Sequence, residues 1–303
     1  MKLVTYSAKG AQHYGAVVGD RVLPLSDKLG QRYPDLKSLI AHNGFAEAEK
    51  ALKDAGPGAA LDSIAFEPVI PNPARILCVG LNYESHRLET GRPIVGHPTI
   101  FQRFASSQTG HKRAMIRPLV STKFDYEGEL VVIIGKPGRY IPLAETMKHV
   151  AGYSIYNEGS VRDWQNHTSQ FSPGKNFPAT GAFGPWMVTA DEVPDPTKLR
   201  LTTRLNGQVM QDAGIDQMIF PIPNLISYCS AFTPLEPGDI IVTGTPGGVG
   251  FKREPPVFMK GGDSVEVEIT GIGALINKIE DEKPSAGFTD SEFAHMAAAR
   301  QLA

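Results

Sequence analysis

Three carboxylates at the ends of two apolar segments are the strongest chemical signal in the sequence. Glu127 and Glu129 stand two positions apart at the start of the apolar run Leu130–Ile134. Because successive side chains of a strand alternate between its faces, both carboxylates point the same way if this run is a strand. Two like charges leading into a buried strand repel each other and resist desolvation unless a cation neutralises them. An E-x-E pair is common, and taken alone it favours a solvated strand edge over a cation site.

Glu158 adds a third carboxylate at the end of the strand-like run Tyr153–Glu158. Three carboxylates at strand ends make a hard oxygen-donor site that suits Mg²⁺ or Mn²⁺, with waters completing an octahedron. Zinc is disfavoured, because no cysteine pair and no His-x₃-His spacing accompanies these acids. The sequence therefore predicts one divalent cation, Mg²⁺ or Mn²⁺, bound by Glu127, Glu129 and Glu158.

A histidine and an acid three positions apart, His86 and Glu89, offer acid–base chemistry. On a short helical turn this spacing brings both side chains to one face. A carboxylate that orients an imidazole makes a competent general base near neutral pH. The alternative is that His86, one of 8 histidines, is an ordinary surface or hydrogen-bonded residue.

A glycine-rich turn after the predicted strand Asp239–Thr243 offers groups that bind anions. The hydroxyl of Thr245 and the neighbouring amides, beginning with Gly244, could bind a carboxylate, since closely spaced backbone donors form anion nests. Residues Gly244–Gly250 lack the Gly-Lys-Ser/Thr ending of a phosphate loop, and no helical pattern follows them. A nucleotide is therefore disfavoured at this turn.

The elements that position these residues form a strand-rich body. Its predicted strands are short, rich in β-branched residues and mostly bounded by Gly, Pro or Asn. They do not alternate regularly with helices, which favours a mixed, β-rich α+β body over a doubly wound parallel sheet. Asn206-Gly207 predicts a type I′ hairpin, because both central residues of that turn need positive φ. The predicted elements are strands at Ile76–Val79, Leu130–Ile134, Trp186–Thr189, Leu199–Leu205, Asp239–Thr243 and Ser264–Thr270, and a helix at Ile222–Ala231.

Two flanking segments differ from this body and divide the chain into three predicted units. Residues 1–71 predict a small α+β domain, with strand-like stretches at 2–6 and 14–25 and helical patterns at 36–42 and 45–55. A proline-rich connector leads to the predicted catalytic domain at 72–283. In residues 284–303, a capping box ahead of the Ala-rich stretch 293–302 predicts a peripheral helix.

Composition limits the classes of function. The 303 residues carry a net charge of −2, with 41% hydrophobic and 20% charged residues, which fits a globular protein and gives no reason to expect a nucleic-acid partner. Cys78 and Cys229 lie in apolar runs, which favours two reduced core cysteines over a disulfide. No apolar run approaches the roughly 20 residues that cross a bilayer, so we expect a cytoplasmic protein without membrane contact.

Five motifs in order make the chain resemble the fumarylacetoacetate hydrolase family, which includes acylpyruvate hydrolases and 2-hydroxyhepta-2,4-diene-1,7-dioate isomerases. The resemblance implies a mixed-strand β-roll of this family's C-terminal type, with the metal site at one end and a homodimer as the usual assembly. The small N-terminal module resembles an extra domain of many members. Glu158 stands where the family has Asp, so it could bind the cation in another mode or through water. The motifs are Gly80-Leu-Asn-Tyr83-x-x-His86, Glu127-Gly-Glu129, Asn157–Gln165, Gly174-Lys175 and Thr243–Gly248.

The resemblance also implies roles for further residues. His86 and Glu89 would belong to a segment that closes over the substrate and activates a water. Lys175, predicted in a loop, would supply positive charge to a developing enolate. Residues that follow Glu158 by four and seven positions would share its face on a helical turn and surround the substrate. The implied substrate contacts are Arg162 and Gln165 on that turn, together with Arg103 and Gln211.

Together these residues predict a divalent-metal hydrolase that cleaves a carbon–carbon bond in a small acylpyruvate-type 2,4-dioxo acid such as fumarylpyruvate. The cation would chelate the 2-oxo acid and polarise its carbonyl, while His86 and Glu89 activate water. The alternatives are an isomerase or decarboxylase of a related 2-oxo dicarboxylate from aromatic catabolism, and a 2-oxo acid binder without turnover. The fold does not choose among them, and the His86–Glu89 pair favours hydrolysis.

Overall fold

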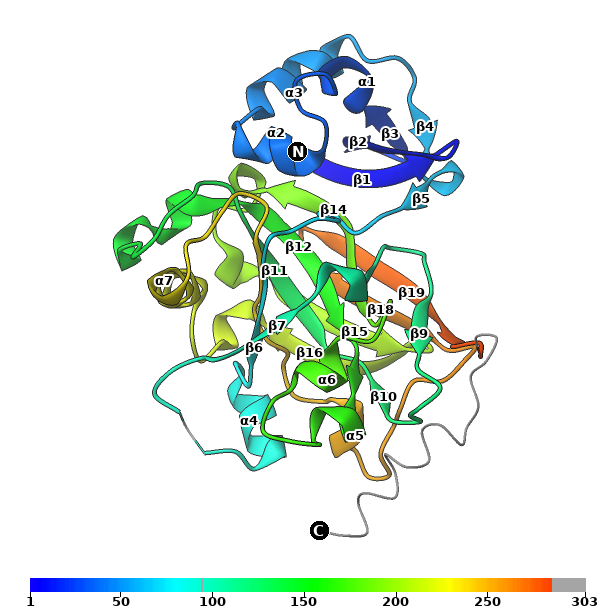
Figure 1. The fold of residues 1–303 in the computed structure, drawn as a ribbon, viewed down its shortest axis with the longest axis vertical. Coiled ribbons are helices and arrows are strands. Elements are labelled where there is room, and N and C mark those ends of the chain that lie inside the picture. Colours follow the sequence, from blue (N-terminus) through cyan, green and yellow to red (C-terminus); the bar gives the residue numbers. More distant parts are fainter. Residues whose placement is uncertain (94, 285–303) are drawn as a thin grey trace.

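The computed structural model describes residues 1–93 and 95–284, which form a β-rich body with a smaller N-terminal unit at one end (Figure 1). Twelve strands build the larger sheet: β1 (Lys2–Ala8), β2 (Ala11–Val18), β3 (Arg21–Pro24), β4 (Ala59–Ala60), β5 (Ala65–Phe66), β6 (Ile76–Gly80), β7 (Thr99–Arg103), β8 (Gln108–Thr109), β11 (Gly128–Ile134), β12 (Val150–Glu158), β14 (Gly181–Thr189) and β17 (Ile240–Val242). Their order is β4-β3-β2-β1-β14-β12-β11-β17-β6-β7, with β5 beside β1 and β8 beside β14. One sheet therefore runs through both parts of the chain.

A second sheet packs within the body and carries the predicted hairpin. It has the order β16-β15-β18-β19-β9, and a two-stranded ribbon pairs β10 with β13. The turn from β15 to β16 places Asn206 at φ +52° and Gly207 at φ +81°, which confirms the hairpin prediction. Most strand pairs are antiparallel, as predicted for a mixed β-rich fold. The bounds are β9 (Met115–Arg117), β10 (Phe124–Asp125), β13 (Ser160–Val161), β15 (Arg200–Leu205), β16 (Gln208–Gly214), β18 (Ser264–Ile269) and β19 (Gly273–Asp281).

Helices are short, and three of them gather near one end of the body (Figure 1). These are α4 (Glu84–Thr90), α5 (Arg162–Gln165) and α6 (Ser172–Lys175), while α7 (Ile222–Phe232) lies on its flank. No helix in the described ranges has both the length and the apolar character that a membrane crossing needs. The others are α1 (Ser26–Leu29), α2 (Leu36–Ala41), α3 (Phe45–Lys53), and the 3₁₀ turns η1 (Leu61–Ser63), η2 (Ala105–Ser107), η3 (Leu143–His149), η4 (Ala190–Glu192), η5 (Pro196–Lys198), η6 (Ile215–Gln217) and η7 (Gly250–Lys252).

Most predicted elements are present, with one difference in the N-terminal unit. The stretch 14–25, predicted as a single strand-like stretch, forms β2 and β3, because the chain reverses at Gly19, which has φ +60°. Helices α2, α3 and α7 confirm the three predicted helices, and Cys78 and Cys229 are buried and unbridged as predicted. The helix predicted at 293–302 lies outside the described residues.

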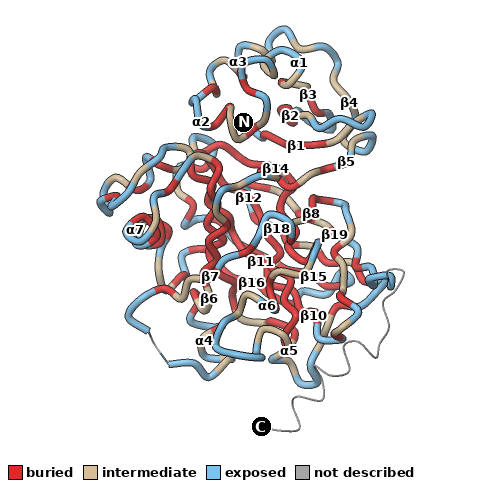
Figure 2. The backbone as a smooth tube through the Cα atoms, viewed as in Figure 1, coloured by how far each residue is buried: buried red, intermediate tan, exposed pale blue. Residues whose placement is uncertain are grey.

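The N-terminal unit and the body share a hydrophobic core. Strand β1 pairs with β14 at Lys2 opposite Val188, and Leu3 packs into a cluster that includes Val131 and Tyr156 of the body. Figure 2 shows the same continuity as a run of buried backbone from β1 into β14, β12 and β11. One sheet joins the two units, and the domain boundary predicted at residue 71 stays a prediction.

His111 lies where the N-terminal unit meets the second sheet, and it is buried. Its ring packs edge-on against Phe66 with the centroids 4.7 Å apart, and its Nδ1 accepts a hydrogen bond from the Ile276 amide at 3.1 Å. Burial, with the charge of Lys112 as a second cause, lowers the pKa of His111 from 6.5 to about 4. The folded protein therefore keeps this imidazole neutral in a pH range where the unfolded chain protonates it.

We expect the free energy of unfolding to fall as the pH drops from 6.5 to about 4, because only the unfolded state binds a proton on His111 in that interval. The shift corresponds to a loss of about 3 kcal/mol over the whole interval. The variant H111Q keeps a hydrogen-bond acceptor but does not titrate, so its unfolding free energy should depend less on pH. Urea titrations across the interval measure both slopes, and equal slopes would contradict the assignment.

Candidate metal centre and active site

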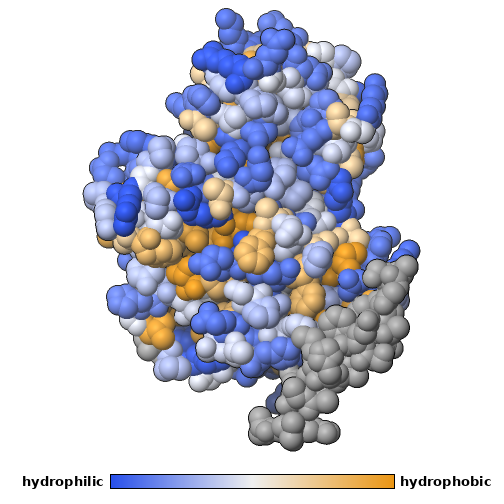
Figure 3. All heavy atoms as spheres, in the orientation of Figure 1, coloured by the Kyte–Doolittle hydropathy of each residue, from blue (hydrophilic) through white to orange (hydrophobic). Residues whose placement is uncertain are grey.

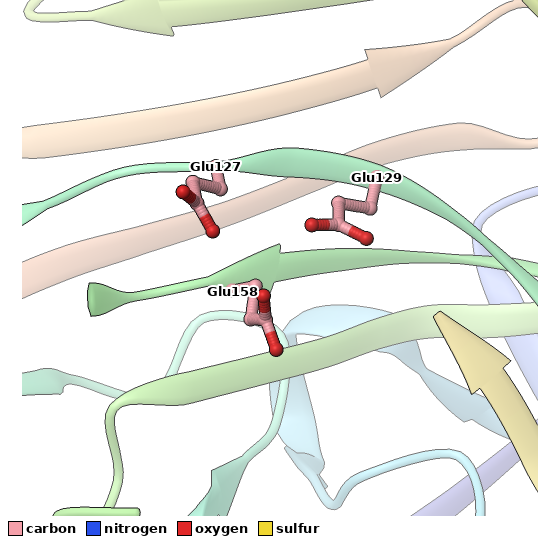
Figure 4. Close-up of side chains that lie close together, drawn as sticks. All are labelled: Glu127, Glu129 and Glu158. Atoms are coloured by element: carbon pink, nitrogen blue, oxygen red, sulfur yellow. The ribbon is translucent and has the colours of Figure 1, made fainter. Parts of the chain in front are cut away.

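The three predicted metal ligands lie together in a buried cluster (Figure 4). One carboxylate oxygen from each of Glu127, Glu129 and Glu158 lies within 4.8 Å of the other two, and no member is more than 4% exposed. Strand β11 carries Glu129 and follows Glu127 directly, whereas Glu158 ends the neighbouring strand β12. The antiparallel pairing of the two strands, with Gly128 opposite Asn157, brings all three carboxylates to one point.

Cations and one backbone amide hold the cluster. Lys175 Nζ lies 2.5 Å from Glu127 Oε2 and 2.8 Å from Glu158 Oε2. Arg162 Nη2 lies 2.7 Å from the other oxygen of Glu127. Glu129 pairs with no cation in the described part of the chain, and its Oε2 accepts a hydrogen bond from the Gly244 amide at 2.5 Å.

Burial and neighbouring charges set the protonation of the cluster. Burial raises the pKa of Glu129 well above its usual value, and the carboxylates of Glu158 and Glu127 raise it further. Burial also opposes ionisation of Glu127, but Arg162 and Lys175 outweigh it and lower that pKa. Burial would lower the pKa of Lys175, yet the two carboxylates it contacts raise it. Within the cluster, Glu129 is therefore the carboxylate whose ionisation its surroundings oppose most.

This donor set fits a divalent cation with a preference for oxygen ligands. Glu158 Oε1 is buried without a hydrogen-bond partner among the described residues, and Arg103 Nη1 lies 3.9 Å from it. An orphaned carboxylate oxygen beside two further carboxylates is satisfied by a cation such as Mg²⁺ or Mn²⁺. The ammonium group of Lys175 already lies between two of the ligands, so it would have to share or leave that space when a cation binds.

A cavity of about 240 Å³ opens onto the three carboxylates. Its walls come from α4, α5, α6, β6 and β7 and from the loops before β11 and around η7, so segments far apart in sequence meet there. The predicted site residues on its surface are His86, Glu127, Glu129, Glu158, Arg162, Gln165, Lys175 and Thr245, and apolar contacts come from Val79, Leu81, Phe101, Phe171 and Phe251.

His86 and Glu89 share one face of α4, as their spacing predicts. His86 Nδ1 lies 2.7 Å from Glu89 Oε1, and Glu89 Oε2 accepts a hydrogen bond from the Gly248 amide at 2.9 Å. The Gly247 amide donates to Ser85 Oγ at 3.0 Å, which fastens the start of α4 to the same glycine-rich turn. Because Nδ1–H donates to the Glu89 carboxylate, the lone pair of Nε2 is available to accept a proton in the cavity that His86 lines.

Comparison with known proteins decides the family. The model described as fumarylacetoacetate (FAA) hydrolase C-terminal matches residues 75–280. The chain belongs to the fumarylacetoacetate hydrolase family. This match covers the strands that carry the metal ligands and every motif on which the resemblance depends.

Relatives within the fumarylacetoacetate hydrolase family differ in their activities. Oxaloacetate tautomerase FAHD2A, mitochondrial, from Bos taurus is 44% identical over 218 residues, 71% of this chain and 69% of that protein. The solved structure of fumarylacetoacetate hydrolase from Exiguobacterium antarcticum is 32% identical with a TM-score of 0.83, and covers 93% of this chain and 100% of that one. Maleylpyruvate hydrolase from Sphingobium sp. SYK-6, in complex with manganese (II) ion and pyruvate, is 27% identical with a TM-score of 0.79 over the same shares. The predicted family and fold are confirmed.

Two local predictions about this family site are wrong. Glu158, Arg162 and Gln165 do not share one helical turn, because β12 continues through Glu158, whose amide donates to the Glu127 carbonyl at 2.8 Å. The short strand β13 follows, and α5 begins only at Arg162. Lys175 does not lie in a loop but ends the single helical turn α6. The tertiary fold nevertheless brings these side chains to the same cavity.

Three predicted substrate contacts lie behind the cavity wall. Gln211 Nε2 donates to Thr245 Oγ1 at 2.7 Å, and its Oε1 accepts from the Gly128 amide at 3.0 Å. Arg103 is buried and donates to the carbonyl of Gly159 at 3.1 Å. The third residue, Gly244, holds Glu129 through its amide as described above. Their contact with substrate stays a prediction, whereas the structure shows each one positioning a neighbour of the metal centre.

Asp125 is a site residue that the sequence reasoning missed. It is fully buried, and its carboxylate accepts hydrogen bonds from the amides of Gly250 at 2.8 Å and Phe251 at 3.0 Å. Arg162 Nε donates to the same carboxylate at 2.8 Å. Burial raises the pKa of Asp125, and the Arg162 charge opposes that rise. The signal was present, because Asp125 extends the alternation of Glu127 and Glu129 by one more step.

Proposed function

We propose that the chain is a divalent-metal enzyme that interconverts the keto and enol forms of a small 2-oxo dicarboxylic acid. The proposal depends on one observation: His86, paired with Glu89, lines a small cavity that opens onto three buried carboxylates. A base oriented by a carboxylate and a cation site in one cavity are the groups that proton abstraction next to a carbonyl requires.

The size of the cavity and the names of two relatives support a small 2-oxo acid. At about 240 Å³ the cavity falls below the roughly 300–1,000 Å³ of sites for drug-sized ligands. The Bos taurus relative is named an oxaloacetate tautomerase, and the Sphingobium relative holds a manganese ion and pyruvate. Both names point to short 2-oxo acids, and Mn²⁺ or Mg²⁺ is the cation we propose for Glu127, Glu129 and Glu158.

Glu127, Glu129 and Glu158 would hold the cation, which when bound would supply Lewis-acid polarisation of the substrate carbonyl. His86 would take a proton from the carbon next to that carbonyl through Nε2, while Glu89 holds the ring by Nδ1–H and stabilises its positive charge. The proton then passes from Nε2 of the protonated His86 to the substrate oxygen to complete the enol, which returns His86 to its neutral form, and the reverse transfers restore the ketone. Lys175 is placed to stabilise negative charge on that oxygen, and Arg162, Gln165 and Thr245 line the space around it.

Hydrolysis of an acylpyruvate-type 2,4-dioxo acid, such as fumarylpyruvate, is the second candidate. The observation that favours it is the same His86–Glu89 pair, which could activate a water for attack on a second carbonyl. Two solved relatives are also named hydrolases. The two candidates share the metal centre and differ in whether the substrate offers a second carbonyl within reach of water.

A panel of 2-oxo acids, assayed with Mn²⁺ or Mg²⁺ in deuterated water, distinguishes these candidates by the mass of the products. We expect oxaloacetate to keep its carbon skeleton and to take up deuterium at the carbon next to the carbonyl, faster than without protein. Two acids from fumarylpyruvate would support hydrolysis instead, and release of CO₂ would support a decarboxylase. If the protein accelerates neither deuterium uptake nor cleavage for any acid of the panel, both candidates are contradicted.

We also propose a homodimer in the cytoplasm, although the Bos taurus relative is named mitochondrial. Large hydrophobic side chains are exposed on α7 and around η3, including Tyr228, Phe232 and Leu143. Figure 3 shows further hydrophobic residues across the middle of the body, whereas the N-terminal unit is largely hydrophilic in this view. Sedimentation of the full chain tests the dimer, and a monomer at all concentrations would contradict it.

A further inference from the structure

Two cations on the cavity surface have no part in the chemistry described so far. Arg92 lies just after α4 and Lys252 ends η7, so they reach the cavity from separate segments. Both residues are exposed to solvent, whereas the three carboxylates are buried, so they lie at the mouth of the cavity rather than at its floor. Neither forms an ion pair with any acid among the residues described, whereas nearby Arg87 pairs with Glu84 at 2.6 Å.

The other cations of this region are already committed to carboxylates or carbonyls. Lys175 and Arg162 contact Glu127, and Arg162 also pairs with Asp125. Arg253 Nη2 donates to the Met210 carbonyl at 2.6 Å. Within the described part of the chain, Arg92 and Lys252 are therefore cations of this cavity that pair with no acid of the protein, and they remain for a second negative group of a ligand.

The cavity thus carries opposite charges at its two ends. Its floor holds the three carboxylates that fit a divalent cation, and that cation would take the 2-oxo acid end of a substrate. Apolar side chains, among them Val79, Phe101 and Phe171, line the same cavity. Positive groups at the mouth complement a second negative group at the other end of the molecule.

We propose that Arg92 and Lys252 form a distal anion subsite that binds the second carboxylate of the substrate. The proposal rests on the proposed function for the 2-oxo acid end and adds the residues that select a dicarboxylate over a monocarboxylate. Because both cations are exposed, the subsite acts by charge attraction, and its contribution to binding weakens as salt concentration rises.

Matched pairs of acids test the subsite by binding, without need for turnover. 2-Oxoglutarate and 2-oxobutyrate differ by one distal carboxylate, and calorimetry in the presence of Mn²⁺ measures the affinity of the whole chain for each. We expect R92Q and K252Q each to lower the affinity for 2-oxoglutarate by about fivefold, and the double variant to lower it by about twentyfold. The affinity for 2-oxobutyrate should stay unchanged in all three variants. The control K50Q removes an exposed positive charge from α3 of the N-terminal unit and should leave both affinities unchanged.

Kinetics with oxaloacetate give a second readout that can fail separately. If the proposed function is correct, the double variant should raise KM for oxaloacetate with little change in kcat. The wild-type chain could turn over no 2-oxo acid while the double variant still loses affinity for 2-oxoglutarate alone. In that case the subsite stands and the proposed function fails. If the double variant lowers the affinity for both acids equally, or for neither, the subsite is overturned whatever the turnover.

Discussion

Replacing His86 with asparagine should lower kcat/KM for keto–enol conversion by about two to four powers of ten, the usual contribution of a general base. The asparagine amide can still donate to Glu89 from the position of Nδ1, but it offers no basic nitrogen in place of Nε2. Since His86 does not touch the three carboxylates as a ligand, Mn²⁺ affinity should stay within about twofold of the wild type.

The matched control for this variant is H42N. His42 caps α2, is exposed, and its Nδ1 lies 2.8 Å from the Ser38 carbonyl, so it resembles His86 in its local hydrogen bond but lies in the N-terminal unit. The control should keep full activity. If H86N retains wild-type kcat/KM, or loses Mn²⁺ binding together with activity, His86 is not the base.

Replacing Lys175 with methionine should lower the free energy of unfolding of the metal-free protein by about 3–5 kcal/mol. The ammonium group contacts Glu127 and Glu158 in a site where all three side chains are at most 5% exposed, so its removal leaves buried carboxylates without their partner. Methionine has a similar length and fills the same space. The variant should also lose most of its activity, because Lys175 lies on the cavity surface beside the metal ligands.

Two comparisons make this prediction specific to the metal centre. In K148M an exposed lysine loses its pair with Glu145, which is 2.6 Å long at the surface, and the expected cost is below about 1 kcal/mol. Saturating Mn²⁺ should stabilise K175M more than the wild type, because the cation no longer displaces an ammonium group. Thermal unfolding with and without Mn²⁺ measures both effects, and equal losses in K175M and K148M would count against a charged cluster at Lys175.

The sequence predicted those parts of the fold and site that depend on local pattern. Alternation along one strand was enough to place Glu127 and Glu129 on one side, and the steric demand of Asn206-Gly207 was enough to predict the hairpin. The spacing of His86 and Glu89 predicted their contact for the same reason, since three positions bring two side chains together on any helical turn.

The remainder depends on contacts between distant segments, which local pattern does not contain. The Gly248 amide reaches Glu89 across 159 positions, and Gln211 reaches Gly128 across 83. The helical spacing assumed from Glu158 to Arg162 was wrong because the pairing of β12 with β11 and of β13 with β10 overrode the local pattern. The burial of Arg103 behind Glu158 could not be predicted either, because burial is a property of the packed chain.

Titration of the metal-free protein with Mn²⁺ tests the central claim most directly, namely that Glu127, Glu129 and Glu158 bind one cation. The account predicts one Mn²⁺ per wild-type chain, and a loss of more than about a hundredfold in affinity for E129Q and for E158Q. The control E266Q removes a carboxylate that pairs with Arg204 on the second sheet and should bind Mn²⁺ as the wild type does. Wild-type protein that binds no Mn²⁺, or E129Q and E158Q that bind it as tightly as the wild type, would contradict the account.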